Sequence, residues 1–505
     1  MRKAFTNKKF WLALLLVCQL ILLICMCGKK QGFHMDEYYT YALANHDGGV
    51  DFNFEKGRLY EGKDLYTYLT CESGEVNLKR VWENQAADVH PPFYYLWIHL
   101  CSALLPGRFC PWIGLGMNIL IALISTVLIW LISGTFFEKD TERLLLTAAA
   151  VLMPGMTESV LLIRMYELAM CEILLLTLLH LKMWEKEPGK KCYGALAGVL
   201  TIGALTHYYV TIFSIVTAVV FGIRLLLKKQ WKRLGAYCGV CAVSGAAAYG
   251  VFPAMIDHVF HSYRGEQIRE HTTQLSDLWQ RVKAFGGFLS KEMFSDILPV
   301  LLGAAVILTV FFLVKKKQPK LPAKILLLII PAAAYFFLIA KASEIISDRY
   351  LFPIFPLCFL AVMICLVLPL ERYRSVVLAA AIFLSVTGWL RFDFPLLYPK
   401  EAQRMETLRE CRDSVGIVIG NGEYYRLIPC LEEFAEMDYV VFVDSDSLEL
   451  LAQHSYRDIN AVVWDDRDNP VRKHMKIIKT FNPDWKKSKL FSSGYMKVYD
   501  FRRAQ

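Results

Sequence analysis

The 505-residue sequence lacks the patterns of several common kinds of site. No combination of cysteine and histidine has the spacing of a structural zinc site, and eight of the fourteen cysteines fall in apolar runs, where cysteine behaves as a small hydrophobe. The glycine-rich turn Gly420–Gly422 lacks the third glycine of a dinucleotide-binding fingerprint. The residue pattern therefore predicts no certain cofactor.

A basic soluble face of the kind that binds nucleic acid is also missing. The net charge is +9, but the lysines and arginines cluster in short links between apolar runs, so nucleic acid is not expected as a partner. Hydrophobic residues make up 55% of the chain. That is more apolar surface than one soluble core could bury, and the bilayer must cover the excess.

No small-residue cleavage site follows the first apolar run, Trp11 to Cys27, which comes after four basic residues. We interpret this run as an uncleaved signal anchor with a cytoplasmic N-terminus. Ten more apolar segments of spanning length predict about eleven transmembrane helices. They lie near residues 112–134, 144–163, 166–184, 193–207, 208–227, 234–253, 297–314, 325–341, 350–370 and 375–391.

Alternate crossing from a cytoplasmic N-terminus places almost every basic link in the cytoplasm, as the positive-inside rule requires. The apolar segment Phe93 to Leu105 is only about thirteen residues long and is interpreted as an interfacial helix, because counting it as a span would invert the later links. Three pieces then lie outside the cell membrane: residues 29–111, a loop near 254–296 that includes a stretch of helical spacing, and the tail from 392.

The tail has a different pattern from the rest of the chain. Strand-like GIVIG, DYVVFVD and NAVVW alternate with helix-like LIPCLEEFAEM and PVRKHMKIIKTF, and KLFSSGYMKVYDF predicts a hairpin. We therefore expect a polytopic α-helical membrane domain over residues 1–391 and a small extracytoplasmic α/β domain over 392–505.

Polar residues gather at the predicted outer ends of the helices. Asp36 and Glu37 form a pair of adjacent carboxylates in the first outer loop; such a pair can deprotonate a hydroxyl, bind a cation or orient a sugar, or can simply begin a solvated loop. His90 precedes two prolines that fix the backbone ahead of the interfacial segment.

Three further clusters interrupt apolar runs: Arg164 with Tyr166, His207 with Tyr208 and Tyr209, and Arg349 with Tyr350. Taken singly, each is explained as well by a snorkelling arginine or a polar turn. All five clusters nevertheless fall on the outer side in a topology that was derived from the basic links alone. The positions of the polar clusters and the topology of the basic links therefore agree, and together they predict a single outward-facing site.

In their order along the chain, these motifs resemble the GT-C superfamily of integral membrane glycosyltransferases, especially its protein O-mannosyltransferase and aminoarabinose transferase branch. The resemblance covers nearly the whole membrane portion and not the tail. It implies a sugar donor linked to polyprenyl phosphate or diphosphate, with transfer on the outer side to a hydroxyl of a glycan, lipid or protein. In that branch a lysine is typical where this chain has His90.

On this resemblance we expect Asp36 to be the base, supported by Glu37, with a divalent cation at the pair as an alternative. We expect Arg164, Arg349 and His90 to stabilise the phosphate leaving group. His207, Tyr166, Tyr208 and Tyr350 are expected to shape the donor pocket. The competing hypotheses are a polytopic secondary transporter and, within the superfamily, a surface-polysaccharide polymerase or ligase.

Overall fold

The computed structural model describes residues 8–262, 277–314, 321–410, 414–419, 428–444, 447–453, 459–463, 485–492 and 497–503. The chain divides into two compact units, each built from three stretches. The membrane unit comprises Met1–Gly28, Gln85–Tyr94 and Gly114–Phe394. The α/β unit comprises Lys29–Asn84, Tyr95–Ile113 and Pro395–Gln505.

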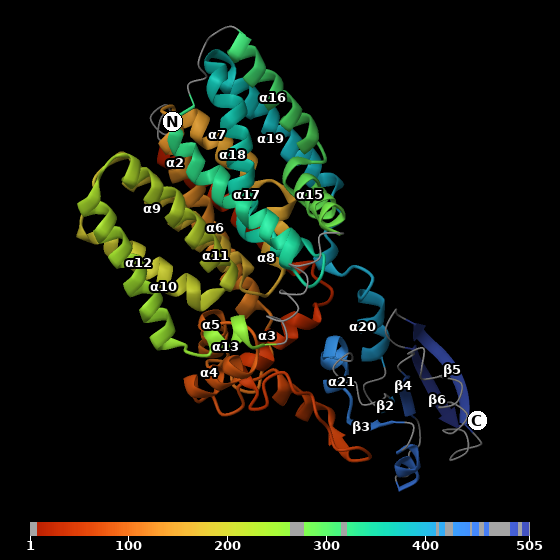
Figure 1. Cartoon of the computed structure of the whole chain (residues 1–505). Helices are drawn as coiled ribbons and strands as arrows, with labels where there is room; N and C mark the ends of the chain where they lie inside the picture. Colours follow the sequence, from red (N-terminus) through yellow and green to blue (C-terminus); the bar gives the residue numbers. More distant parts are fainter. Residues whose placement is uncertain are drawn as a thin grey trace. The chain divides into compact units, whose positions relative to one another are not determined.

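The membrane unit consists of helices that follow the predicted apolar segments (Figure 1). Their bounds are α2 (Lys8–Gly28), α6 (Trp112–Phe136), α7 (Asp140–Val151), α8 (Pro154–Leu161), α9 (Tyr166–Glu185), α10 (Lys190–Thr206), α11 (Tyr208–Leu227), α12 (Trp231–Val251), α13 (Met255–Phe260), α15 (Leu278–Phe294), α16 (Leu298–Val314), α17 (Leu326–Ala342), α18 (Phe355–Val367) and α19 (Arg374–Arg391). Short 3-10 turns η3 (Asp348–Tyr350) and η4 (Phe352–Ile354) precede α18.

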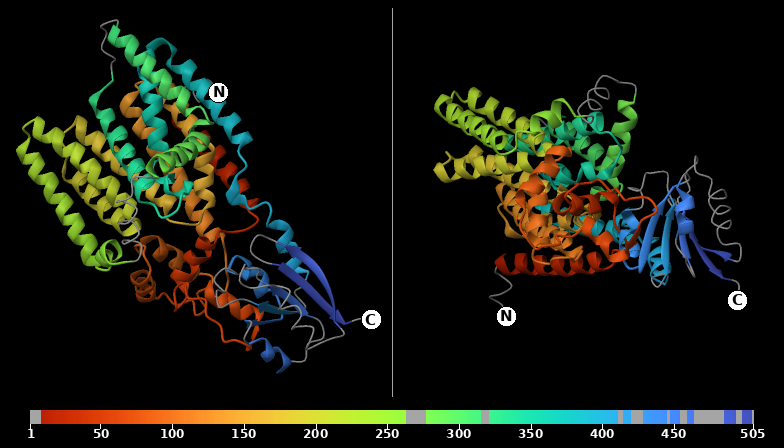
Figure 2. Two further views of the ribbon diagram at one scale, coloured as in Figure 1. Left: turned by 45° about the vertical axis from the view of Figure 1, so that its right-hand side comes forward. Right: turned by 90° about the horizontal axis from the view of Figure 1, so that it is seen from below.

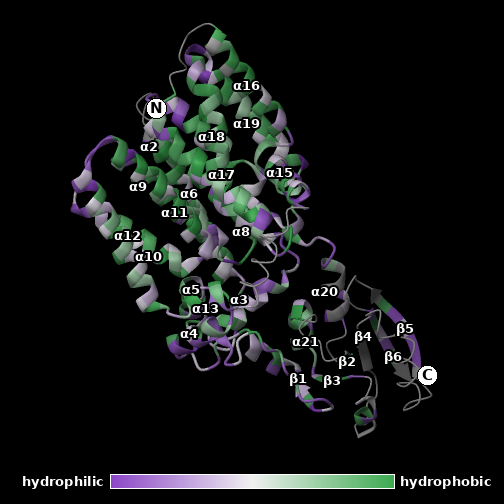
Figure 3. Cartoon of the chain, viewed as in Figure 1, coloured by the Kyte–Doolittle hydropathy of each residue, from purple (hydrophilic) through white to green (hydrophobic). Residues whose placement is uncertain are grey.

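Two groups of helices are visible within this unit. Helices α9 to α12 lie side by side in Figure 1 and in both views of Figure 2. Helix α19 packs against α7, and α15 packs against α17, α18 and α8. In Figure 3 helices α16, α18 and α19 are mostly hydrophobic, and hydrophilic residues gather at the links from α9 to α10 and from α11 to α12.

All eleven predicted segments are helical, but the count of eleven spans is not confirmed. Within the described residues, six helices are long and apolar enough to cross a membrane, or eight if the bent pairs α7–α8 and α15–α16 each count as one span. Helix α10 has only 17 residues, and α9 carries Glu167, Glu172 and Lys182 along its length. Helix α5 (Phe93–Ser102) has ten residues, about half the length that a bilayer requires.

Basic side chains tie several helix ends together at one end of the membrane unit. Arg224 of α11 and Arg233 of α12 donate hydrogen bonds of 2.6 and 2.8 Å to the carbonyls of Trp184 and Met183, which lie at the end of α9. Lys324, just before α17, also contacts Glu185 at the end of α9. The basic links therefore share one end of the bundle, as alternate crossing predicted.

The α/β unit contains one six-stranded sheet. Its strands are β1 (Leu59–Glu61), β2 (Val415–Ile419), β3 (Tyr439–Val443), β4 (Ile459–Val463), β5 (Trp485–Ser492) and β6 (Lys497–Arg503), and their spatial order is β1-β3-β2-β4-β6-β5. Strands β3, β2 and β4 are parallel, and the other neighbours are antiparallel. The apolar runs VGIVI and YVVFV are buried, as expected of central parallel strands.

The remaining helices are α3 (Met35–Asn45), α4 (Leu78–Ala87), α20 (Ala402–Arg409) and α21 (Leu431–Ala435). The remaining 3-10 turns are η1 (Gly62–Tyr68), η2 (Ala323–Ile325), η5 (Leu368–Tyr373), η6 (Pro395–Leu397) and η8 (Leu448–Gln453). The predicted strands and the antiparallel pairing of the hairpin are confirmed. The predicted turn at 420–422 and the predicted helix at 470–481 lie outside the described residues. Strand β1, which comes from the first long loop, was not predicted from the sequence. The fold class, a helical membrane protein with a small α/β region, is confirmed.

A substitution of Asn118 tests whether its side chain stabilises the break between α8 and α9. It is fully buried in α6, donates to the carbonyls of Val160 and Leu162 at 3.2 and 2.8 Å, and accepts from the Tyr94 hydroxyl at 3.2 Å. Asn118→Leu leaves those carbonyls unsatisfied, so we expect it to lower the free energy of unfolding by about 1–3 kcal/mol. Thermal unfolding in detergent measures this; Tyr94→Phe should cost less, and equal stability of all three proteins would contradict the assignment.

Candidate functional site

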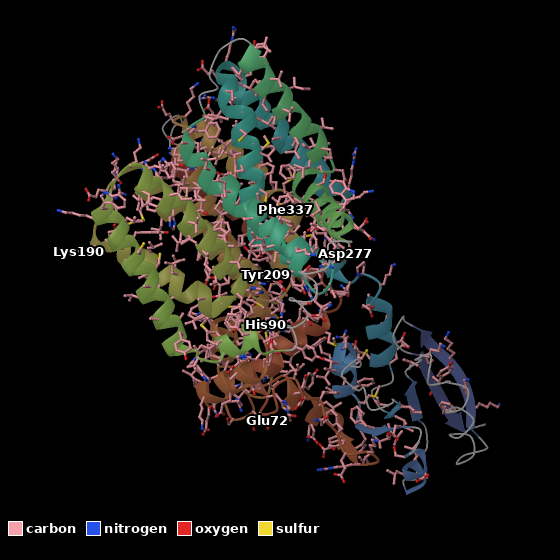
Figure 4. The ribbon with its side chains drawn as sticks, viewed as in Figure 1. Glu72, His90, Lys190, Tyr209, Asp277 and Phe337 are labelled. Atoms are coloured by element: carbon pink, nitrogen blue, oxygen red, sulfur yellow. The ribbon has the colours of Figure 1, made fainter. Side chains whose placement is uncertain are left out.

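Six of the predicted site residues come together at one end of the membrane unit, where helices begin or are interrupted. They are His90, Arg164, Tyr166, His207, Arg349 and Tyr350. Figure 4 labels His90 and Tyr209 in this region, and it labels Lys190 at the other end of α10. We call this set, with Asp88 and Tyr209, the helix-break cluster.

Arg164 lies in the break between α8 and α9. Leu162 has an extended backbone that ends α8, and the Asn118 side chain satisfies two of the carbonyls that this break leaves without helical partners. Arg164 is 5% exposed. A buried arginine keeps its charge and needs polar partners, because an isolated charge in an apolar interior is unstable.

His90 connects Arg164 to Asp88. The His90 Nδ1 lies 2.6 Å from an Asp88 carboxylate oxygen, and its Nε2 lies 3.4 Å from a terminal nitrogen of Arg164. In the neutral ring, Nε2 accepts from the guanidinium, which can only donate, and Nδ1 donates to Asp88. In this geometry His90 lies between Asp88 and Arg164 and orients Arg164.

The Asp88 carboxyl is mostly buried beside this link. Burial alone would raise its pKa, but the His90 ring and its hydrogen bond, with a further contribution from Arg164, lower the pKa to about 2 from an ordinary 3.8. Asp88 is therefore ionised over the whole physiological range. Its negative charge holds His90 in the orientation that accepts from Arg164.

His207 interrupts the polypeptide between α10 and α11. Its backbone is extended, with φ −159° and ψ 135°, and its Nδ1 accepts a 3.0 Å hydrogen bond from the Tyr209 N–H, which caps α11. In the neutral ring the proton is therefore on Nε2, which is a donor. The ring is 6% exposed, and its centroid lies 6.3 Å from that of His90.

Tyrosines join His207 to the arginine of the SDRY segment. The Tyr166 ring lies 5.4 Å from His207 and 6.2 Å from Tyr350, and the Arg349 guanidinium lies 5.3 Å from the centre of the Tyr350 ring. The Tyr335 hydroxyl of α17 donates to the Tyr350 carbonyl at 2.8 Å and holds this turn in place. Tyrosine faces and arginine together suit a sugar phosphate, because rings pack on sugars and guanidinium binds phosphate in bidentate fashion.

Tyr208 has a different environment from the one expected. Its hydroxyl lies 2.7 Å from His258 Nδ1 in α13, and His258 Nε2 lies 3.2 Å from the Ala86 carbonyl. The neighbouring Tyr209 packs on His207 at 4.4 Å and on Tyr350 at 5.9 Å. Because successive side chains at the start of a helix point about 100° apart, only one of the two tyrosines can face the cluster.

Asp36 and Glu37 belong to the α/β unit, in the first turn of α3, and their environments differ. The Glu37 side chain is 1% exposed and forms a 3.2 Å ion pair with Lys30, and it also accepts the His34 N–H at 2.6 Å. The Asp36 side chain is 21% exposed, and the Asp36 N–H donates to His34 Nδ1 at 3.1 Å. Asp36 is therefore the more accessible of the two carboxylates.

The two carboxylates of the Asp36–Glu37 pair are not equally accessible to a divalent cation. Lys30 and the His34 N–H already occupy a Glu37 oxygen, which leaves Asp36 as the only solvent-facing ligand of the two. Over the part of the chain that the structure describes, no group of three or more histidine, cysteine, aspartate or glutamate side chains is arranged to hold a metal ion.

Three residues, two in the membrane unit and one in the α/β unit, could not be recognised by motif. Asn118 and Tyr335 each hold a helix break through side-chain hydrogen bonds to carbonyls, and Lys30 neutralises Glu37. The signal for Asn118 was a lone amide within a 25-residue apolar helix, where a polar side chain requires a partner. Nothing in the sequence distinguished Tyr335 from other core tyrosines.

The fold is shared with two solved structures of another protein. The chain is similar to ArnT from Cupriavidus metallidurans, both in the apo state (TM-score 0.54, 12% identity) and bound to undecaprenyl phosphate (TM-score 0.54, 11% identity). Each alignment covers 97% of this chain and 98% of that chain. The fold that the resemblance implied is therefore confirmed.

A structure of the archaeal oligosaccharyltransferase AglB from Archaeoglobus fulgidus aligns with 99% of this chain and 75% of its own, at 9% identity and a TM-score of 0.43, below the level at which a shared fold can be argued. No family model and no curated protein matches the sequence.

The dependence of thermal stability on pH tests the Asp88–His90 pair. Because the folded-state pKa of Asp88 lies below its ordinary value, the stability that the pair contributes, about 2 kcal/mol, is fully present above about pH 4 and is lost as pH falls towards 2. We expect wild type to unfold at a higher temperature than Asp88→Asn from pH 7 down to about 4, with the difference shrinking below that. A difference that is absent at pH 7, or constant down to pH 2, would contradict the pairing.

Proposed function

We propose that the protein is an integral membrane glycosyltransferase that moves a sugar from a polyprenyl phosphate or diphosphate donor to a hydroxyl group. One observation carries this proposal: a buried arginine, oriented by His90 and surrounded by histidine and tyrosine rings, lies at helix breaks of a fold shared with ArnT. One of the ArnT structures is bound to undecaprenyl phosphate. The acceptor is a glycan, a lipid or a protein.

The chemistry of such a donor suits the end of a helical bundle. Its isoprenoid tail remains in the hydrocarbon, and its phosphate and sugar lie at the interface, which is the position that we assign to the helix breaks. Arg164 meets the phosphate with charge-assisted hydrogen bonds, and the Nε2–H of His207 is a further donor. His90 acts one step back, because its Nε2 is directed at Arg164.

The outer side of the membrane is the side that we assign to the reaction. The lysines and arginines at the other end of the bundle favour a cytoplasmic position for that end, by the positive-inside rule. Nucleotide sugars are cytoplasmic and would not reach an outward-facing site. A lipid-linked donor is held in the membrane and can present its sugar at the outer side.

In the proposed reaction the acceptor hydroxyl attacks the anomeric carbon of the donor sugar. A new carbon–oxygen bond forms to the acceptor, the bond from the anomeric carbon to the phosphate oxygen breaks, and polyprenyl phosphate leaves with the bonding electrons. The hydroxyl proton passes to Asp36, which we assign as the base from the superfamily resemblance and from its partial exposure. Arg164 and Arg349 stabilise the charge that develops on the phosphate.

A polymerase or ligase of surface polysaccharide uses the same chemistry with a glycan acceptor, so acceptor choice distinguishes it. A secondary transporter requires ionisable groups that couple transport near the middle of the bilayer. The helix-break cluster lies at one end of the bundle, which favours a transferase. Release of polyprenyl phosphate, as opposed to accumulation of a solute inside vesicles, separates the two classes.

Arg164 tests the donor site. In proteoliposomes supplied with a polyprenyl-phosphate sugar, we expect Arg164→Ala to reduce kcat/KM about a hundredfold or more, since it removes the main phosphate contact. Arg164→Lys should recover only part of this, because lysine lacks the planar fork. Lys190→Ala, at the other end of α10, is the control, and an Arg164→Ala enzyme with wild-type kinetics would remove the proposed site.

Asp36 tests the base. We expect Asp36→Asn to lower kcat by about 10²–10⁴-fold while the donor still binds, because the variant keeps the shape of the carboxylate but cannot accept the proton. The control is Asp47→Asn, an exposed acid of the same unit. Undiminished transfer by folded Asp36→Asn would exclude Asp36 as the base.

A further inference from the structure

A lysine that no motif indicated lies buried in the α/β unit. The Lys30 ammonium is 3.2 Å from the Glu37 carboxylate and donates to the Leu396 carbonyl at 2.9 Å. It also lies 5.0 Å from the centre of the Phe33 ring and 5.1 Å from that of Tyr398. We call these five residues the Lys30 cage.

Both charges of the cage are removed from water. The side chains of Lys30 and Glu37 are each 1% exposed. Two buried charges are stable only when they are paired and their remaining hydrogen-bonding capacity is used. The cage meets this requirement with one carboxylate, one carbonyl and two aromatic faces, which attract a cation electrostatically.

The cage joins two distant stretches of sequence, and the backbone is adapted to the junction. The Gln31 N–H donates to the Leu397 carbonyl at 2.7 Å. A Cβ on Gly32 would lie 3.2 Å from the Cβ atoms of Tyr398 and Glu401, so only glycine permits this approach without displacement. Tyr398 has a φ of +52°, a strained value for a tyrosine that the surrounding contacts must maintain.

The cage also fixes the first turn of α3, which carries Asp36. The Glu37 oxygen that meets Lys30 also accepts the His34 N–H at 2.6 Å, and the His34 ring accepts the Asp36 N–H at 3.1 Å. Glu37 is therefore held through its carboxylate, and His34, two residues before Asp36, is held through its backbone N–H. The position of the Asp36 backbone depends on Lys30 through Glu37.

We propose that Lys30 and Glu37 are positioning residues for Asp36, and that Glu37 takes no direct part in proton transfer. This inference rests on the proposed function. It gives the two adjacent acids separate tasks, because Glu37 is a buried ion-pair partner and Asp36 meets the substrate. It also gives the start of the C-terminal region a task, since Leu396 and Tyr398 supply one side of the cage.

The test compares two measurements on the full-length protein in proteoliposomes. Hydrogen–deuterium exchange at the amides of residues 34–37 reports whether the turn is held, and kcat with the polyprenyl-phosphate sugar reports whether the turn serves the reaction. The variants are Lys30→Met, Tyr398→Leu and the conservative Tyr398→Phe, which keeps the aromatic face. Lys63→Met, an exposed lysine paired with Glu61, is the matched control.

We expect Lys30→Met to accelerate exchange at residues 34–37 and to lower kcat about a hundredfold, because a displacement of about 1 Å at a reacting group has an effect of that size. The KM for the donor should remain close to wild type. Tyr398→Leu should show the same pattern more weakly, and Tyr398→Phe should restore both measurements. If Lys30→Met does not fold, the double variant Lys30→Met/Glu37→Gln is used in place of the single variant. The double variant leaves no buried charge unpaired.

Three results would overturn the inference. Faster exchange with wild-type kcat would mean that the cage is structural only. Unchanged exchange in Lys30→Met would mean that the cage does not hold the turn. Absence of transfer by the wild type would overturn the proposed function and the positioning role with it, and this failure is distinguishable because it appears before any variant is made.

Discussion

The arrangement of the membrane unit depends on the need to satisfy backbone polar groups where its helices are interrupted. Water does not reach the carbonyls and amides at a buried break, so neighbouring side chains must bond them. Asn118 does this for the end of α8, His207 caps α11 and Tyr335 bonds the turn before α18. These interruptions lie at one end of the bundle, and they bring Arg164, His207 and Arg349 to it.

Much of this arrangement was predictable because it follows from simple periodic signals. Long apolar runs identified the helices, and the lysine-rich links identified the opposite end of the bundle. The alternation of valine and isoleucine in the tail identified β2, β3 and β4. The resemblance to the GT-C superfamily predicted the fold, and the ArnT structures share it. Three motifs of the cluster, those of Arg164, His207 and Arg349, were predictable for the same reason, since each of them interrupts an apolar run.

The remainder depends on tertiary contacts that leave no periodic signal. The sequence does not show whether Tyr208 or Tyr209 faces the cluster. In the structure Tyr208 is hydrogen-bonded to His258 and does not face it. His90 was expected to meet phosphate directly, but its two ring nitrogens are directed at Asp88 and Arg164. The adjacent acids Asp36 and Glu37 look equivalent in sequence, and only the buried Lys30 distinguishes them. The pairing of β1 with β3, across about 380 residues, is also a tertiary contact that no sequence pattern predicted.

The central claim is that the helix-break cluster binds the phosphate of a lipid-linked sugar donor. The most direct measurement is photo-crosslinking of the protein in proteoliposomes with a polyprenyl phosphate that carries a photoreactive group next to the phosphate, followed by mapping of the labelled peptides. The account predicts labelling of the peptides that contain Arg164, His207 and Arg349, with competition by unlabelled polyprenyl phosphate. Labelling confined to the lipid-facing surfaces of α16 and α19, without competition, would contradict it.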